Sequence, residues 1–280
     1  MIHGLRQKHK VRLLCEIADL PRSSYYYHTK QMEKPDKYAN VKAEIQSIYT
    51  ENRVRMGYRR ITLALHNRGL LINHKTVLRL MKQLGLFCRV RMKRYNSYRG
   101  DVGEIIPNLL QRDFYADRPN KKWVTDVTEF SLFGQKLYLS PILDLFNGEI
   151  ISYSLSQHPR FSQTVEMLEK AFLKTPYGSN LILHSDQGWQ YQMKPYQTML
   201  KEKGIRQSMS RKGNCLDNAV MENFFGILKT ELLYLQTFDS IEHFIAELKE
   251  YLDYYNYRRI KQKLKGMSPV QYRFHTLQPA

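Results

Sequence analysis

One stretch decides how this chain folds: Asn214-Cys-Leu-Asp-Asn-Ala-Val-Met-Glu-Asn-Phe-Phe-Gly-Ile-Leu-Lys-Thr-Glu-Leu-Leu233. Its apolar side chains recur at helical spacing and predict one amphipathic helix, which Asp217 or Asn218 would cap by accepting a backbone N–H. Glu222 and Lys229 are seven residues apart, nearly two turns, so an acid and a base share one edge. Taken alone, such a pair is more typical of a solvated helix face, and its meaning depends on partners elsewhere in the chain.

Charge is distributed unevenly along the 280 residues. Residues 1–122 carry 26 Lys and Arg against 10 Asp and Glu, whereas residues 123–280 carry 18 against 16. The excess of +16 in the first part predicts a polyanionic partner, because each neutralised phosphate releases a counterion. A role in solubility alone is the alternative. The hydrophobic fraction of 42% is enough for a folded core, so global disorder is not expected.

Several classes of protein are disfavoured by what the sequence lacks. Cys15, Cys88 and Cys215 form no CxxC pair, which argues against a disulfide framework or a thiolate zinc site. No apolar run is long enough for a membrane span or a signal peptide, and no phosphate-binding loop of the ATPase type is present. These features predict a cytoplasmic protein, nucleoid-associated when bound to DNA, with no membrane partner.

Residues 1–35 predict a short helical segment interrupted near Pro21. A small helix-turn-helix and a helical hairpin packed on a partner are both compatible with it.

Residues 40–100 predict a helix-turn-helix DNA-binding domain with a basic arm. Helices are expected over 41–50, 58–67 and 74–84, with Asn73 capping the last. The last helix would enter a major groove, and the candidate DNA contacts on its outward face are Lys75, Arg79 and Lys82. The candidate contacts of the arm are Arg89, Arg91, Lys93 and Arg94. A plain flexible linker is the alternative reading of the arm.

A linker over residues 101–118 precedes a segment of different composition, residues 119–238. The expected order is three strands, helix, strand, helix, strand and helix, which predicts a mixed α/β sheet flanked by helices. The strands are expected at 122–132, 137–145, 149–155, 181–183 and 206–210, with one helix capped by Ser162 and another over 195–203.

Two aspartates occupy notable places in this segment. Asp126 is expected in the middle of a strand, where Asp is depleted, and Asp186 ends a strand at a glycine turn. An exposed edge acid and a turn or helix cap are the structural alternatives. If both met Glu222 at one sheet edge, the carboxylates would repel each other unless a cation such as magnesium or manganese bound between them.

Three motifs together carry a specific resemblance: Trp123-Val-Thr-Asp, His184-Ser-Asp-Gln-Gly-Trp-Gln-Tyr and Ser210-Arg-Lys-Gly-Asn-Cys-Leu-Asp-Asn-Ala-Val-Met-Glu-Asn-Phe-Phe-Gly-Ile-Leu-Lys. They resemble the DDE transposases of the third insertion-sequence family, OrfB type, including the 35 residues between Asp186 and Glu222. The resemblance extends from the N-terminal helical part to the closing Tyr254–Tyr272. It implies a ribonuclease-H-like integrase catalytic core, preceded by an all-α helix-turn-helix region.

Two departures from related proteins are visible. Leu216 and Val220 stand where many relatives carry Trp and Pro, which concerns the subgroup and the start of the helix rather than the carboxylates. The His/Cys zinc module of a retroviral integrase is also missing from the sequence.

The resemblance implies a catalytic triad of Asp126, Asp186 and Glu222 that holds two magnesium (or manganese) ions, about 3.5–4 Å apart. Such a site would hydrolyse DNA ends and join them to target DNA by transesterification, without a covalent protein intermediate. Lys229 would contact DNA near the cut end. His184 and Asn218 are possible neighbours of the site, with a structural histidine and an N-cap as their alternatives.

Residues 239–280 predict a last amphipathic helix and a basic tail whose Arg258, Arg259, Lys261, Lys263 and Lys265 would contact phosphates. The resemblance also implies a homo-oligomer and, because no heptad zipper is present, an upstream OrfA-type partner or fusion. The leading interpretation is a DNA transposase that acts on element ends and target. A non-catalytic DNA-binding repressor and a metal-dependent nuclease that cuts without joining are the alternatives.

Overall fold

The computed structural model describes residues 2–32, 35–88, 105–175, 180–212 and 214–277. The basic arm, with Arg89, Arg91, Lys93 and Arg94, lies outside the described residues. Among the helices of the described ranges, none is both long and apolar enough to cross a membrane.

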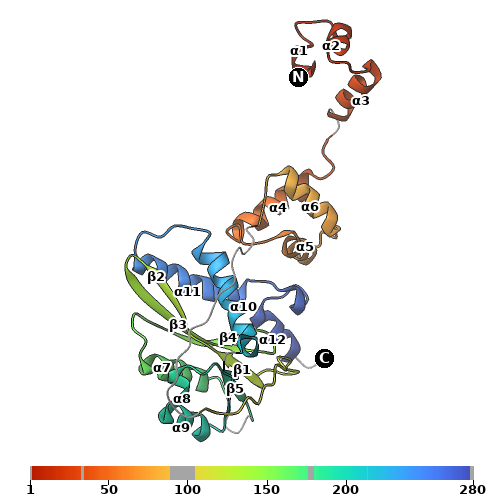
Figure 1. Ribbon diagram of the computed structural model, residues 1–280. Helices are drawn as coiled ribbons and strands as arrows, with labels where there is room; N and C mark the ends of the chain where they lie inside the picture. The colour runs from red at the N-terminus through yellow and green to blue at the C-terminus, as the bar shows by residue number, and fades with distance from the viewer. Residues whose placement is uncertain (1, 33–34, 89–104, 176–179, 213, 278–280) are drawn as a thin grey trace.

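Three short helices open the chain and lie apart from the rest of the molecule in Figure 1. They are α1 (Ile2–Leu5), α2 (Val11–Ile17) and α3 (Arg22–Met32). The helical character expected for residues 1–35 is confirmed, and Pro21 separates α2 from α3 as expected.

A second helical unit follows the expected helix-turn-helix pattern: α4 (Ala39–Glu51), α5 (Tyr58–Asn67) and α6 (His74–Gln83). The Asn73 side chain accepts the Lys75 N–H at 2.8 Å and so caps α6, as predicted. Apolar side chains of the three helices form one core, which also takes in Ile260 from the C-terminal part of the chain.

The second half of the described chain folds around a mixed six-stranded sheet (Figure 1). Its strands are β1 (Lys122–Thr125), β2 (Thr128–Leu132), β3 (Gln135–Asp144), β4 (Ile150–Ser156), β5 (Ile182–Ser185) and β6 (Arg206–Met209). β3 pairs antiparallel with β1 and β2 on one side and with β4 on the other. β1 pairs parallel with β5, and β5 parallel with β6. The predicted mixed sheet flanked by helices is confirmed.

The strand predicted over 122–132 is interrupted after Thr125. β1 and β2 keep one register against β3 across the gap, and this register places Asp126 opposite Pro141. Proline has no N–H to donate to the ladder. The prediction that Asp126 lies inside a strand is therefore wrong: it follows the carboxyl end of β1.

Helices cover both faces of the sheet. On one face lie α7 (Phe161–Phe172), α8 (Trp189–Gln192) and α9 (Lys194–Glu202), whose apolar side chains pack around Trp123. The prediction that Ser162 caps a helix is wrong, because α7 begins at Phe161 with Arg160 at the N-cap.

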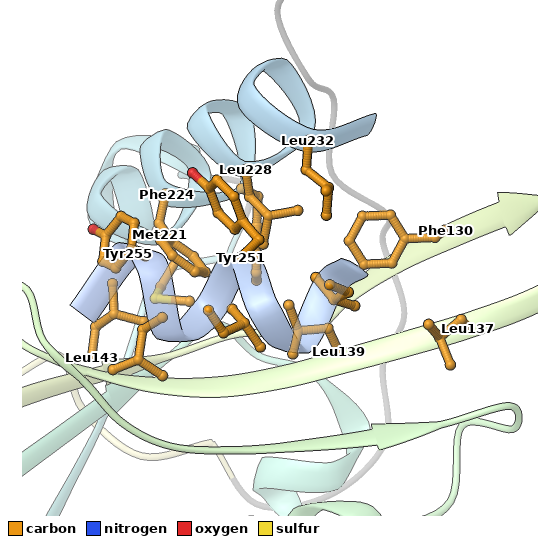
Figure 2. Close-up of a cluster of buried hydrophobic side chains, with 14 of the residues drawn as sticks. Phe130, Leu137, Leu139, Leu143, Met221, Phe224, Leu228, Leu232, Tyr251 and Tyr255 are labelled. Carbon is orange, nitrogen blue, oxygen red and sulfur yellow. The ribbon is translucent and has the colours of Figure 1, made fainter. Parts of the chain in front are cut away.

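The other face is covered by α10 (Ala219–Leu228) and α11 (Ile241–Tyr257). Figure 2 shows their buried side chains pointing toward those of β2 and β3. Within this cluster, the ring centroids of Phe224 and Tyr255 are 5.0 Å apart in an edge-on arrangement.

The stretch 214–233 is not one regular helix. A 3₁₀ turn over Cys215–Asn218, here η1, precedes α10, and a turn of π-helix over Lys229–Leu233, here η2, follows it. Neither Asp217 nor Asn218 caps α10 through its side chain, contrary to the prediction.

The C-terminal part contains more structure than the predicted basic tail. After α11, which Ser240 caps by accepting the His243 N–H at 3.1 Å, come η3 (Gln262–Leu264) and α12 (Pro269–Leu277). The prediction that Arg259 contacts phosphate is wrong, since its guanidinium is buried against Glu231.

Lys261 differs from the prediction in the same way. Its Nζ donates to the carbonyl of Gly148 at 3.2 Å and to the hydroxyl of Tyr255 at 2.9 Å. These contacts orient its ammonium toward the protein rather than toward a phosphate.

Substituting Phe224 tests the packing of α10 on the sheet. We expect Phe224→Ala to lower the free energy of unfolding by about 3–5 kcal/mol, because a buried aromatic ring is replaced by a cavity. Urea unfolding would measure the loss. Leu173→Ala is the control, since Leu173 is 89% exposed and its truncation should change stability by less than about 0.5 kcal/mol. Equal effects of the two substitutions would contradict this role of the cluster.

Candidate active site

Asp126 and Asp186 follow the carboxyl ends of two neighbouring parallel strands. The pairing of β1 with β5 matches Val124 to His184, and continuing it by two residues brings Asp126 level with Asp186. Adjacent strands are about 4.8 Å apart, so the two aspartates lie side by side at one edge of the sheet.

The side chains of both aspartates point toward the face of the sheet that α10 covers. Val124, two residues before Asp126, belongs to the apolar cluster of α10, whereas Trp123 belongs to the cluster on the opposite face. His184, two residues before Asp186, contacts the carbonyl of Asp217 just ahead of α10. Since side chains alternate between the faces of a strand, both carboxylates point to the side of α10.

Glu222 lies in the first turn of α10 and is half-buried. The charges of Asp186 and Glu222 both act on Asp126, which places the three carboxylates within electrostatic reach of one another. The Asp126 carboxylate accepts a hydrogen bond from the backbone N–H of Val127 at 2.7 Å. The Asp186 carboxylate accepts one from the backbone N–H of Gly188 at 2.9 Å.

The pKa values of the two aspartates report this crowding. Burial, then the negative charges of Asp186 and Glu222, raise the pKa of Asp126 well above its usual 3.8. Burial also raises the pKa of Asp186, although the Gly188 N–H opposes the change. The site therefore favours either protonation or a bound cation.

The carboxylates are near one another without forming a closed ligand shell. Within the described ranges, no group of three or more His, Cys, Asp or Glu side chains is gathered tightly enough to hold a metal ion.

Asn218 lies one turn before Glu222 and is 5% exposed. Neither its side-chain oxygen nor its nitrogen has a hydrogen-bond partner in the described part of the chain. A buried amide without partners costs free energy, so it marks a place where a further polar group would be stabilised.

His184 is fully buried and connects three elements. Its Nδ1 lies 2.8 Å from the Ser208 hydroxyl of β6, and its Nε2 lies 3.0 Å from the carbonyl of Asp217 in η1. Burial lowers the pKa of His184 to about 4, so the ring is neutral near pH 7. Its contacts fix the start of α10 relative to the sheet.

Asp217, predicted as a helix cap, instead holds together segments that are distant in sequence. Its buried carboxylate accepts from Arg211 at 2.9 and 3.0 Å, from Arg112 at 2.9 Å and from Asn108 at 3.0 Å. Part of the stretch predicted as a linker is thereby anchored against η1. No sequence signal could have paired Arg112 with an acid about a hundred residues away.

The remaining candidates lie at other places. Lys229 begins η2, and its Nζ is 5.7 Å from the centre of the Phe130 ring on β2. Lys75, Arg79 and Lys82 are exposed along α6, as predicted, and they belong to the helix-turn-helix unit rather than to the carboxylate site.

Comparisons with known proteins identify the family of the chain. The family description "Integrase core domain" matches residues 116–215 and again 222–277, and "HTH-like domain" matches residues 35–94. The InsK protein of insertion sequence element IS150 from Escherichia coli K12 is 57% identical over 279 residues, which cover 100% of this chain and 99% of InsK. The chain belongs to the transposases of the third insertion-sequence family.

More distant relatives share nearly the whole length of this transposase. Transposase InsF for insertion sequence IS3A from Escherichia coli K12 is 32% identical over 269 residues, 94% of this chain and 93% of InsF. The transposase for IS904 from Lactococcus lactis is 35% identical over 233 residues, 82% and 91% of the two chains. Among solved structures, a chain of a simian T-cell lymphotropic virus intasome matches 84% of the transposase and 76% of its own length, with a TM-score of 0.50 and 19% identity, which shows a shared fold.

Stability near pH 5 should depend on His184. A histidine whose pKa is lowered by folding binds a proton more readily when unfolded, so the transposase loses stability as the pH falls from 6.5 toward 4. We expect this loss to reach about 2 kcal/mol between about pH 7 and pH 5, and to disappear in His184→Gln. Urea unfolding at both pH values measures it, with His243→Gln as the exposed control. The same pH dependence in His184→Gln and wild type would contradict it.

The titration of Asp126 should change the pH dependence of stability in the opposite direction to that of His184. Its pKa is raised by folding, so it stabilises the fold at low pH and this stabilisation is lost as the pH rises through the raised pKa. In EDTA near pH 8, we expect Asp126→Asn to unfold at a higher temperature than wild type, because the substitution removes a buried charge next to two others. A lower melting temperature in this variant would show that the carboxylates do not repel one another.

Proposed function

We propose that this transposase cleaves the DNA ends of its element and transfers them to target DNA with a DDE triad, Asp126, Asp186 and Glu222. The observation that supports this most directly is the placement of Asp126 level with Asp186 at the ends of β1 and β5, with the charges of Asp186 and of Glu222 in α10 both acting on Asp126.

We propose magnesium or manganese, with two ions expected, as the cofactor of this site. Carboxylate oxygens are the ligands that both cations prefer, and the raised pKa values of Asp126 and Asp186, caused first by burial, support a site that a bound cation would stabilise. When bound, such ions activate a water or hydroxyl nucleophile and stabilise the leaving oxygen. The unpartnered amide of Asn218 fits a position where it would hydrogen-bond a ligand or the substrate.

The protein's own residues have distinct roles in this proposal. Asp126 and Asp186 are fixed by the parallel pairing of their strands, while Glu222 is carried by α10. His184 holds the start of α10 through the Asp217 carbonyl and is too weak a base, with its pKa near 4, to serve as a proton acceptor at neutral pH. Lys229, directly after the last residue of α10, would contact the phosphate backbone of the end being cut.

DNA is the proposed partner, as element ends and as target. The strongly basic first part of the chain supplies sequence-independent affinity, and α6 is the helix proposed to enter a major groove. Its candidate contacts are Lys75, Arg79 and Lys82, and those of the following arm are Arg89, Arg91, Lys93 and Arg94. Because two ends are joined in one event, we also propose a homo-oligomer, with an OrfA-type partner or fusion as a further component.

A strand-transfer assay with labelled element-end DNA and magnesium tests the triad. We expect Asp126→Asn, Asp186→Asn and Glu222→Gln each to reduce both cleavage and joining by about a thousandfold or more, because each removes a negatively charged ligand. Wild type is assayed with and without an OrfA-type protein.

Glu129→Gln is the matched control for this assay. Glu129 is an exposed acid on β2 that pairs with Lys136, and its loss should leave joining within about twofold. Full activity of any triad variant would overturn the proposal. Cleavage without joining would indicate a nuclease, and DNA binding without either reaction would indicate a repressor.

A further inference from the structure

The N-terminal helices α2 and α3 are joined by a short turn, residues 18–21. The Leu20 N–H donates to the Cys15 carbonyl at 2.9 Å. The Asp19 N–H donates to the Glu16 carbonyl at 3.3 Å, and the two bonds together form a Schellman motif that ends α2. Asp19 has the left-handed conformation that this motif requires, with a φ of 48°, which Asp tolerates better than most residues. The turn between α2 and α3 is therefore a defined structure and not a loose connection.

α2 and α3 each bury one side chain in the unit that they form. Cys15 of α2 is 2% exposed and Tyr25 of α3 is 5% exposed. Both α1 and α3 contact α2, so the three helices make one small unit, here called the α1–α3 unit. Two helices held by a turn of three or four residues have the connectivity of a helix-turn-helix. The match to the HTH-like family description begins only at residue 35, after these helices.

One face of α3 is exposed and free of acids. Positions i, i+1, i+4, i+5 and i+8 of a helix lie on one face. In α3 these positions hold five exposed residues, here called the α3 stripe: Arg22, Ser23, Tyr26, Tyr27 and Lys30. α3 contains no Asp or Glu, and residues 1–32 carry six Lys and Arg against two Asp and Glu. The α1–α3 unit lies apart from the other units in Figure 1, so the stripe faces outward.

The chemistry of the α3 stripe fits the major groove of DNA. Arginine and lysine side chains bind phosphates, and arginine also donates two hydrogen bonds to the edge of guanine. Serine and tyrosine hydroxyls bond to phosphates as well. The exposed apolar side chains suited to a protein partner, Leu13 at 50% and Ile17 at 76%, lie instead on α2. An acid-free, basic and hydroxyl-bearing helix face therefore favours a polyanion as its ligand.

The length of the connection limits where this ligand can lie. α3 ends at Met32 and α4 begins at Ala39, so seven residue steps separate them. Fully extended, they span at most about 25 Å. One turn of DNA is longer, about 34 Å. The α1–α3 unit is thus held close to the stretch of DNA proposed for α6.

We propose that α2 and α3 form a second DNA-binding site, in which α3 enters a major groove of the element end next to the stretch occupied by α6. Arg22 and Tyr27 contact the DNA from the α3 stripe, and the element end is recognised at two adjacent places. The proposal rests on DNA as the partner proposed above, and it gives the first 32 residues a part in sequence recognition.

Binding of full-length transposase to labelled element-end DNA without magnesium tests this site, with DNA of unrelated sequence measured beside it. We expect Arg22→Gln and Tyr27→Ala each to weaken binding to element-end DNA by about tenfold and to unrelated DNA by less than about threefold, because base contacts distinguish sequences and phosphate contacts do not. In a footprint, both variants should lose protection over one stretch, and Arg79→Gln on α6 should lose a neighbouring, different stretch.

Arg12→Gln is the matched control. Arg12 is an exposed arginine of the same unit, but it lies on α2 and pairs with Glu16 at 3.2 Å. Its loss should leave both affinities within about twofold and the footprint unchanged. Circular dichroism and melting temperature show that each variant is folded. Arg22 and Tyr27 are both exposed, so the second substitution carries the test if the first disturbs α3.

The outcomes separate this site from the proposed function. Unchanged affinity and footprint in both α3 variants would overturn the second site and leave the triad and α6 proposals intact. Failure of wild type to bind any DNA would overturn DNA as the partner, and the second site with it. Loss of strand transfer in Ile17→Ser, with normal DNA binding by the α3 variants, would assign the α1–α3 unit to a protein partner instead.

Discussion

The parallel pairing of β1 with β5 is the constraint on which the rest of the site depends. It places two aspartates level with each other at the end of the sheet, where their charges oppose one another. Two neighbouring negative charges cost folding free energy, so the aspartates stay side by side only because the rest of the fold fixes their strands. Packing on both faces of the sheet does this. Trp123 and its neighbours fill one side, and α10 with its aromatic cluster presses on the other. The stability of the sheet thus maintains a local concentration of negative charge.

Much of this arrangement was readable from the sequence, because it follows from short-range patterns. Alternating or continuous apolar runs located the strands, helical spacing located α4 to α7 and α9 to α11, and Asn73 identified the start of α6. The spacing of Asp186 and Glu222 within recognisable motifs identified the candidate triad, whose catalytic role stays a prediction.

The features that escaped prediction depend on partners far away in the chain. Arg259 has the same local sequence character as an exposed phosphate contact, and only the folded structure brings Glu231 to it. Likewise, the register places Asp126 opposite Pro141 in the neighbouring strand, and Arg55 of the helix-turn-helix unit donates to the Glu231 carbonyl in the π-turn after Leu228. Periodicity describes a segment by itself and contains no information on such contacts.

The insertion of Ile260 into the core of α4–α6 has a consequence for biosynthesis. A ribosome makes α4, α5 and α6 early and Ile260 near the end, so the nascent helical unit emerges with one apolar position of its core unfilled. Only a chain translated to its last part can supply the missing side chain. The helix-turn-helix unit therefore completes its core only after the residues of the carboxylate site have been made, and a prematurely terminated product is deprived of both the C-terminal helices and a complete helix-turn-helix core.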